Sequence, residues 1–389
     1  MRIIHIGPFS GNSGDLFAYS AFQKMFRKYV TSECEFTNLN IREFYRNNQK
    51  YRFDLDLAKK INTYDMLIIG GGLYFDVRWN YSSTGTTLDF SEGFLDALKV
   101  PVLFNSIGYA EPEEGAWVEK EQQDIFSKFE RFVESLVRHK NVMVTIRNDG
   151  SYERLKKRFG KDFADLFYRI PDNGFYFDKD ISPIEFEEER LTVGISVAND
   201  SFVKNSNLNL NNFNNSMVEF IQGLISTYNA RIIFFPQIPK DIEVISEIVG
   251  MLTESEKRFN LVVAPYNTLD VFAARMLVSY YKACDLCVCM RLHANIIALQ
   301  NRIPTLGLSV NGLVSGERIH AIYDWMDINE YSVQVHSSQI DISDILLRYV
   351  EFLKSHTYDF DSKIKKAMSR IEVESERFFC MIKEFVKVE

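Results

Sequence analysis

Residues 65–72 read Asp65-Met-Leu-Ile-Ile-Gly-Gly-Gly72, a short apolar run that leads directly into three glycines. A run of this length, bounded by glycine, predicts a buried strand over Asp65–Ile69. Parallel α/β sheets build their ligand sites at the carboxyl ends of their strands, where glycine lets the backbone approach a ligand closely. We therefore expect Gly71 and Gly72 to contact a ligand.

The sequence around this run alternates apolar β-branched segments with stretches of helical periodicity. This alternation is typical of βαβ units and a mainly parallel sheet. Further strands are expected at Arg2–Ile6, Val102–Ser106, Val142–Ile146 and Phe167–Ile170. Helices are expected between them at Asp15–Tyr29, Phe90–Lys99, Gln123–His139 and Gly150–Phe159.

The second half of the chain repeats the alternation after an acidic connector that holds four glutamates in residues 185–189. Its strands are expected at Thr192–Val197, Ala230–Pro236, Leu261–Ala264 and Leu286–Met290, and its helices at Asn212–Tyr228, Ile242–Leu252, Val271–Cys284 and Ala294–Gln300. A chain of 389 residues exceeds the roughly 250 residues at which single cores stop growing. We therefore predict one α/β domain over residues 1–185, a second over 190–350, and an amphipathic helix over 359–389 that packs back on them.

The composition is that of an ordinary globular protein, with 46% hydrophobic and 25% charged residues. The formal net charge of −8 argues against a protein that binds nucleic acid through a broad basic surface. No window reaches the roughly 18 consecutive apolar residues of a spanning helix. The N-terminus also lacks the apolar core and cleavage site of a signal peptide, so we expect a cytoplasmic protein without a transmembrane segment.

Three of the five cysteines, Cys284, Cys287 and Cys289, share one apolar segment. A second pair of ligands at zinc-site spacing is missing from the sequence. We expect these cysteines to be buried as small hydrophobic residues. We expect neither a metal site nor a bound cofactor.

The segment Arg291-Leu-His293 joins an apolar strand to the helix expected at Ala294–Gln300. Side chains two residues apart share one side of an extended turn, so Arg291 and His293 are expected to face the same way. A helix N-terminus favours anions, and histidine can move a proton near neutral pH. A lone histidine is more often structural, but the neighbouring arginine favours an anion site here.

Polar residues also follow the strands of the first half. The turn Gly11-Asn12-Ser-Gly-Asp15 follows the first strand, where backbone N–H groups can hold an anion. The alternative is a tight turn in which Asp15 only caps the first helix. Ser106 ends a later strand and is a further candidate for binding substrate.

Arg147 lies at the end of the strand expected at Val142–Ile146. Its forked guanidinium can bind a carboxylate or a phosphate through two hydrogen bonds. The alternative is a salt bridge with Asp149 or Asp172. We favour the ligand role.

The sequence resembles the polysaccharide pyruvyltransferase family over residues 1–312. The resemblance is carried, in chain order, by Gly11-Asn-Ser-Gly-Asp15, Asp65-x4-Gly70-Gly-Gly72, Ser106-x-Gly108, Ile146-Arg-Asn-Asp149-x-Ser151, Pro171-Asp172 and Arg291-Leu-His293-Ala, the last followed by Ile303-Pro304. It implies a fold like that of GT-B glycosyltransferases, with two Rossmann-like domains facing a cleft. It also implies phosphoenolpyruvate as the donor and a sugar of a polysaccharide precursor, such as a capsule or exopolysaccharide unit, as the acceptor.

The resemblance places the acceptor on the first domain and the donor on the second. It makes Arg147, Arg291, His293, Gly71 and Gly72 the expected donor-binding residues, with His293 as general acid or as a stabiliser of the departing phosphate. The candidates for substrate binding are Asn12, Ser106, Asp149, Asp172 and Arg318, and those for deprotonating a hydroxyl are Asp15, Asp149 and Asp172. Family members commonly carry a lysine-containing turn where this chain reads Leu308–Arg318, so Arg318 is the candidate for that cation.

Two other functions fit the same residues. A GT-B glycosyltransferase would place Arg291 and His293 on the diphosphate of a nucleotide sugar. A non-catalytic module that binds phosphate or sugar would show no turnover. A lipid-linked acceptor would require peripheral contact with the inner face of a membrane.

Overall fold

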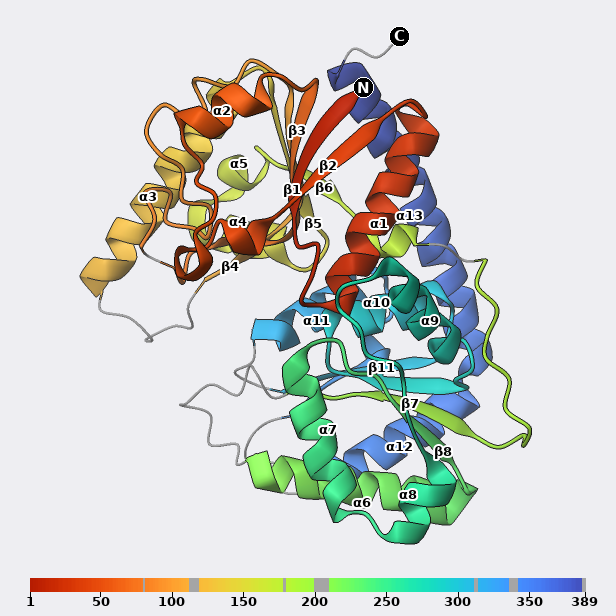
Figure 1. Ribbon diagram of the computed structural model, residues 1–389. Helices are drawn as coiled ribbons and strands as arrows, with labels where there is room; N and C mark the ends of the chain where they lie inside the picture. Colours follow the sequence, from red (N-terminus) through yellow and green to blue (C-terminus); the bar gives the residue numbers. More distant parts are fainter. Residues whose placement is uncertain are drawn as a thin grey trace. The chain divides into compact units, whose positions relative to one another are not determined.

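The computed structural model describes residues 1–79, 81–111, 119–177, 180–198, 210–310, 314–335 and 342–386, and it contains two six-stranded parallel sheets flanked by helices (Figure 1). The chain forms two compact units. Unit 1 comprises Met1–Ser10, Ala18–Tyr176 and Glu372–Glu389, and unit 2 comprises Gly11–Phe17 and Phe177–Ile371. The predicted α/β class with two sheets is confirmed.

The sheet of unit 1 has the strand order β2-β1-β3-β4-β5-β6. These strands are β1 (Arg2–Gly7), β2 (Glu35–Asn40), β3 (Met66–Asp76), β4 (Val102–Ala110), β5 (Val142–Arg147) and β6 (Tyr168–Ile170). The helices that accompany them are α1 (Ser13–Tyr29), α2 (Leu55–Ile61), α3 (Glu119–Arg138), α4 (Ser151–Phe159) and α5 (Lys161–Ala164). Apolar side chains from β1, β3, β4 and β5 form one core with residues of α2, α3 and α4.

Two expected strands run further than the sequence predicted. The strand expected to end at Ile69 continues as β3 to Asp76, and the one expected to end at Ser106 continues as β4 to Ala110. Both are distorted at the same level, where Gly70 pairs with Asn105 and both Gly71 and Ser106 adopt positive φ. Beyond this kink both segments return to strand geometry. The three glycines of β3 and Ser106 of β4 therefore lie within their strands and not at the strand ends.

The helix expected at Phe90–Lys99 is wrong. Phe90 instead forms an isolated bridge with Phe53, and turns follow it. Gly93 adopts a φ of 74°, which is incompatible with a right-handed helix. The apolar spacing of Phe90, Phe94 and Leu98 reflects core packing of a turn-rich segment.

The sheet of unit 2 has the order β12-β11-β10-β7-β8-β9. Its strands are β7 (Thr192–Ser196), β8 (Arg231–Phe234), β9 (Leu261–Val263), β10 (Leu286–Cys289), β11 (Thr305–Val310) and β12 (Ser332–Val335). Its helices include α6 (Leu210–Tyr228), α7 (Pro239–Met251), α8 (Glu254–Asn260), α9 (Val271–Tyr281), α10 (Leu292–Gln300), α11 (Val314–Trp325) and α12 (Ile342–Ser355). The strands and helices predicted in this half are all present, with bounds that shift by a few residues.

Short polar residues define several helix starts. The side chain of Asp54 accepts the N–H of Leu57 at the start of α2, and Asp270 accepts the N–H of Phe272 at the start of α9. These contacts satisfy N–H groups that a helix N-terminus leaves without an intrahelical partner.

The final helix, α13 (Thr357–Phe385), is amphipathic as predicted. Its first part belongs to unit 2, where Phe360 and Ile364 are fully buried. Its last part belongs to unit 1, where Phe379 packs against Phe22 and Tyr29. The apolar stripe of α13 is therefore covered by protein.

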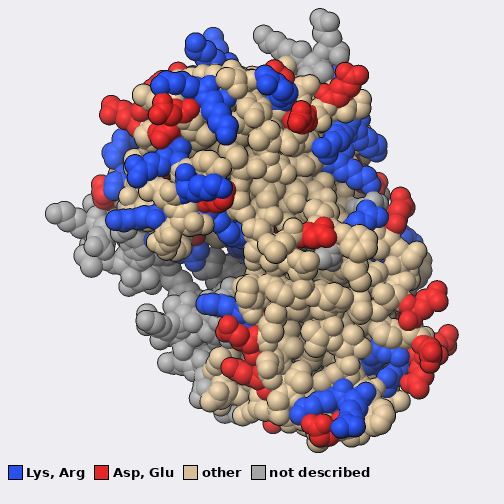
Figure 2. All heavy atoms as spheres, in the orientation of Figure 1, with Lys and Arg blue, Asp and Glu red and all other residues tan. Residues whose placement is uncertain are grey.

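Among the residues that the structure describes, no helix combines the length and apolar character needed to cross a membrane. Basic and acidic side chains are interspersed on the face that Figure 2 shows, in keeping with the modest net charge.

Candidate functional site

The turn between β10 and α10 is held rigidly by one buried side chain, Asn295. Its amide nitrogen donates to the carbonyls of Cys289, at 3.0 Å, and of Arg291, at 2.8 Å. Its amide oxygen accepts the hydroxyl of Tyr323 at 2.8 Å. Arg291 is the N-cap residue of α10, in extended geometry, so His293 lies in the first turn of the helix. The dipole and N–H groups of such a turn favour an anion.

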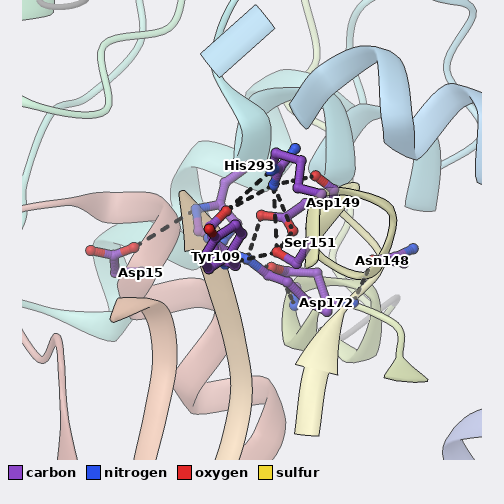
Figure 3. A network of polar contacts seen from close by, with 10 residues as sticks. Asp15, Tyr109, Asn148, Asp149, Ser151, Asp172 and His293 are labelled. Atoms are coloured by element: carbon purple, nitrogen blue, oxygen red, sulfur yellow. Dashed lines mark hydrogen bonds and ion pairs between the residues drawn. The ribbon is translucent and has the colours of Figure 1, made fainter. Parts of the chain in front are cut away.

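The first turn of α1 is anchored to the same edge of the unit 2 sheet. The N–H of Ser13 donates to the carbonyl of Gln237 at 3.0 Å, and the N–H of Gly11 donates to that of Thr268 at 3.1 Å. This anchoring brings a carboxylate oxygen of Asp15 to 3.9 Å from Nδ1 of His293 (Figure 3). Both side chains are largely buried. A carboxylate therefore faces the imidazole ring.

Gly14 makes this approach sterically feasible. A Cβ atom on Gly14 would lie 2.5 Å from Cβ and 2.6 Å from Nδ1 of His293, closer than real contacts allow. The side-chain oxygen of Asn12 accepts the N–H of Gly14 at 2.8 Å and closes the turn. Asn12 thus has a structural contact in addition to its predicted role in binding substrate.

Arg291 is paired with Asp241, a residue that the sequence did not indicate as part of a site. Nε of Arg291 lies 3.1 Å and 3.3 Å from the two carboxylate oxygens, and Nη2 also donates to Oδ1. Oδ2 of Asp241 accepts the N–H groups of Gln237, at 2.9 Å, and Ile238, at 3.2 Å. Burial raises the pKa of Asp241, and the charge of Arg291 and these hydrogen bonds counteract part of that rise.

A sequence signal for Asp241 existed. Pro239 occupies the first position of α7 and Asp241 the third, a pattern typical of a helix start. The predicted helix began at Ile242 and so left this carboxylate outside it. Its pairing with Arg291, 50 residues away, had no local signal.

Arg318, the last candidate in this unit, lies half-buried in α11.

Unit 1 places its candidate residues in a second cluster, around Arg147. Nε of Arg147 donates to Asp149 at 2.8 Å, and Nη1 donates to Asp172 at 3.1 Å. Burial alone would lower the pKa of Arg147, but the two carboxylates outweigh it and raise that pKa. The salt bridges that the sequence offered as the alternative role of Arg147 are present, and its role in binding the donor remains a prediction.

The same cluster joins the ends of three strands. The hydroxyl of Ser151 donates to Asp149 and accepts the N–H of Tyr109 at 2.8 Å (Figure 3). The side-chain oxygen of Asn148 accepts the N–H of Asp172 at 2.9 Å. Asp149 and Asp172 are therefore fixed in orientation, and Ser151 and Asn148 are contacts that the sequence did not assign.

Ser106 and the glycines lie at the kink of β3 and β4. The N–H of Ser106 donates to the hydroxyl of Thr145 at 2.8 Å, and its own side chain is fully buried. A Cβ on Gly71 would lie 3.2 Å from the amide nitrogen of Asn173, and one on Gly72 would lie 2.5 Å from the ring of Tyr74. The absence of side chains at these glycines thus allows close packing inside unit 1, while their contact with a donor remains a prediction.

Among the described residues, no group of three or more histidine, cysteine, aspartate or glutamate side chains is arranged to hold a metal ion. Cys284, Cys287 and Cys289 are buried, as predicted, and they form no disulfide.

Two parallel Rossmann-like sheets with these strand-end sites define an α/β fold of the GT-B glycosyltransferase type. The chain matches the polysaccharide pyruvyl transferase family over residues 12–312, more than half of its length, and it belongs to that family. It is a transferase with a role in polysaccharide modification.

Solved structures support the fold. HepE from Anabaena, in complex with UDP and glucose, is similar with a TM-score of 0.58 at 10% identity, over 99% of this chain and 100% of that one. MnaA from S. aureus, solved with UDP, gives a TM-score of 0.55 at 11% identity, over 100% and 97% of the two chains. A putative UDP-N-acetylglucosamine 2-epimerase from Listeria monocytogenes gives 0.54 at 10% identity, also over 100% and 97%. No curated protein matches the sequence.

Proposed function

We propose that this protein transfers the pyruvyl group of phosphoenolpyruvate to two hydroxyls of one sugar in a polysaccharide precursor, forming a ketal and releasing phosphate. Membership of the polysaccharide pyruvyl transferase family supports the reaction class. One observation carries the proposal. His293, in the first turn of α10 and two residues after Arg291, is paired with Asp15 from the first turn of α1. This edge of unit 2 offers both positive charge and a group that moves protons.

The reaction forms two C–O bonds at the same carbon, the first by addition and the second by displacement. One sugar hydroxyl adds across the double bond of the donor: its oxygen bonds to C2, a proton is delivered to C3, and the hydroxyl gives up its own proton, which restores the proton donor. The oxygen of the second hydroxyl then displaces phosphate from C2, and the proton of that hydroxyl is released. We assign the delivery of the proton to His293, with Asp15 stabilising the charged ring. No oxidant or reductant is needed for this balance.

The charges of the two units suit different substrates. Arg291 and the α10 N-terminus favour the anionic donor. In unit 2, Arg291 is paired with one carboxylate, that of Asp241, whereas in unit 1 Arg147 lies between two, those of Asp149 and Asp172. We therefore place the donor at the unit 2 edge. We assign Asp149 and Asp172 to the hydroxyls of the acceptor, because carboxylates accept hydrogen bonds from hydroxyls.

Calorimetric titration of phosphoenolpyruvate tests the donor without a known acceptor. The wild type should bind, and Arg291→Ala should lose binding. Arg302→Ala is the matched control, because Arg302 lies in the same unit, is partly exposed and pairs with Asp361. A folded wild type that does not bind phosphoenolpyruvate, alone or with a saccharide acceptor added, would remove the donor from this proposal.

The second candidate is a glycosyltransferase that uses a nucleotide sugar. It is favoured by one observation: HepE, whose structure is similar, was solved with UDP and glucose. Titration with UDP separates the two functions. Tight binding of UDP together with no binding of phosphoenolpyruvate would favour glycosyl transfer.

A further inference from the structure

We infer that Asp241 is a positioning residue for the proposed reaction, which acts by fixing the guanidinium of Arg291 at the entrance to α10. The inference rests on the proposed function, in which Arg291 binds the donor. Asp241 itself follows β8, whereas Arg291 follows β10, and β7 separates these strands in the sheet. The ion pair therefore bridges the carboxyl end of β7 and joins two segments that the sheet does not pair directly.

Asp241 is a rigid anchor because both of its oxygens are engaged. Oδ2 accepts the N–H groups of Gln237 and Ile238, which fixes the carboxylate at the start of α7. Oδ1 accepts from Nε and Nη2 of Arg291. The side chain of Asp241 is fully buried, and that of Arg291 is 13% exposed. Charge-assisted contacts of this kind, shielded from water, are strong and directional.

The turn that carries Asp241 also holds the other side of the site. The carbonyl of Gln237 accepts the N–H of Ser13, and Ser13 begins the helix that presents Asp15 to His293. Residues 237–241 thus fix both Arg291, through the carboxylate, and Asp15, through the backbone.

Asp241 acts on the donor only through Arg291. Its contacts occupy Nε and Nη2, along one side of the planar guanidinium, and so set the plane in which the group lies. Lysine at position 291 would retain the charge but could not be fixed by two contacts.

The first variant to test is Asp241→Asn. The amide oxygen can still accept the N–H groups of Gln237 and Ile238, but its NH₂ group would face the guanidinium donors. Asp270→Asn is the matched control, because Asp270 caps α9 in the same unit through the N–H of Phe272. We expect Asp241→Asn to weaken phosphoenolpyruvate binding by about tenfold or more, as misplacement of a binding group does. We expect Asp270→Asn to leave binding unchanged.

The double variant separates positioning from general loss of structure. Asp241→Asn in an Arg291→Lys background should cause no further loss of phosphoenolpyruvate affinity, because the planar group that Asp241 orients is already removed. Additive losses would overturn the inference. If Asp241→Asn fails to fold, Arg291→Lys replaces it, and near-wild-type binding by that variant would also overturn the inference.

A second readout does not depend on the donor. Phenylglyoxal modifies accessible arginines, and mass spectrometry reports the rate at Arg291. That rate should rise several-fold in Asp241→Asn and stay unchanged in Asp270→Asn. Failure of wild-type protein to bind phosphoenolpyruvate would remove the proposed donor, whereas an unchanged modification rate at Arg291 would remove the positioning role of Asp241.

Discussion

Gly14 lies directly against His293, so closely that a methyl group on Gly14 would approach Cβ of the histidine to 2.5 Å. Gly14 lies in the first turn of α1, and His293 lies in the first turn of α10. Because Gly14, the residue before Asp15, has no side chain, the imidazole of His293 can lie close to Asp15.

Gly14→Ala should displace either the turn or the ring. A shift of about 1 Å at a reacting group can reduce turnover by on the order of 10²-fold. We expect a loss of this order in phosphate release once an acceptor is identified, with the fold retained. Activity within twofold of wild type would show that the contact relaxes without affecting the site.

Gly250→Ala is the matched control for Gly14→Ala. Gly250 lies within α7 of the same unit, and a Cβ there meets no atom within 4 Å. This variant should keep full activity and gain roughly 0.5–1 kcal/mol of stability, because alanine restricts the unfolded chain. Chemical denaturation measures that gain.

Arg147→Met should destabilise unit 1 strongly. The variant removes a buried cation from Asp149 and Asp172, and breaking a buried pair in this way typically costs about 3–5 kcal/mol. Urea unfolding at pH 7 gives the value. Arg169→Met is the control, since the Arg169–Glu153 pair is exposed and long, and it should change stability little. Equal losses in the two variants would mean that burial does not strengthen the Arg147 pairs.

His5 should make stability depend on pH. Burial lowers the pKa of His5 to about 4, although its hydrogen bond with the carbonyl of Gly70 opposes the shift. Below the unfolded pKa of about 6.5, the unfolded chain binds a proton that the folded chain does not. Stability is therefore complete above pH 6.5 and falls as the pH drops toward 4, by roughly 3 kcal/mol for a shift of this size.

Denaturation curves at pH 7 and pH 5 check this prediction. His5→Gln should flatten the dependence over that range, even if it lowers stability at pH 7. His356→Gln, at an exposed position, should leave the dependence as it is in the wild type. A wild-type slope that survives His5→Gln unchanged would assign the effect to other groups.

The sequence predicted the elements whose apolar pattern is strong and local. β5, β7, β10 and the helix α13 fall close to their expected bounds, because each buries a continuous or periodic set of apolar residues. β2 was missed because its residues Glu35–Asn40 are mostly polar. The aromatic spacing of the segment at Phe90 is helical and predicts a helix, but the positive φ of Gly93 prevents one.

The candidate site was predictable only where residues are close in sequence. The sequence predicted the strand-to-helix turn at Arg291 and His293, because these two residues and Leu292 are adjacent and lie between an apolar strand and a helical pattern. The pairing of Arg291 with Asp241, and the contact between Gly14 and His293, join segments that only the folded sheet brings together. A glycine in a turn and an aspartate at a helix start each have a sufficient local explanation, so neither indicates a distant partner.

Asn295→Asp should disrupt the β10–α10 turn with almost no change in shape. The amide nitrogen donates to the carbonyls of Cys289 and Arg291, and a carboxylate oxygen in its place would face two acceptors. Because the residue is fully buried, each unsatisfied group costs about 1–3 kcal/mol, and more if the carboxylate is charged. Asn301→Asp is the control, because Asn301 donates to one carbonyl, that of Ile297, at the less buried end of α10. We expect Asn295→Asp to lower the unfolding midpoint clearly and to abolish donor binding, and Asn301→Asp to do neither. Normal donor binding by a stable Asn295→Asp protein would show that the turn does not depend on this amide, and that the anion site at His293 has another support.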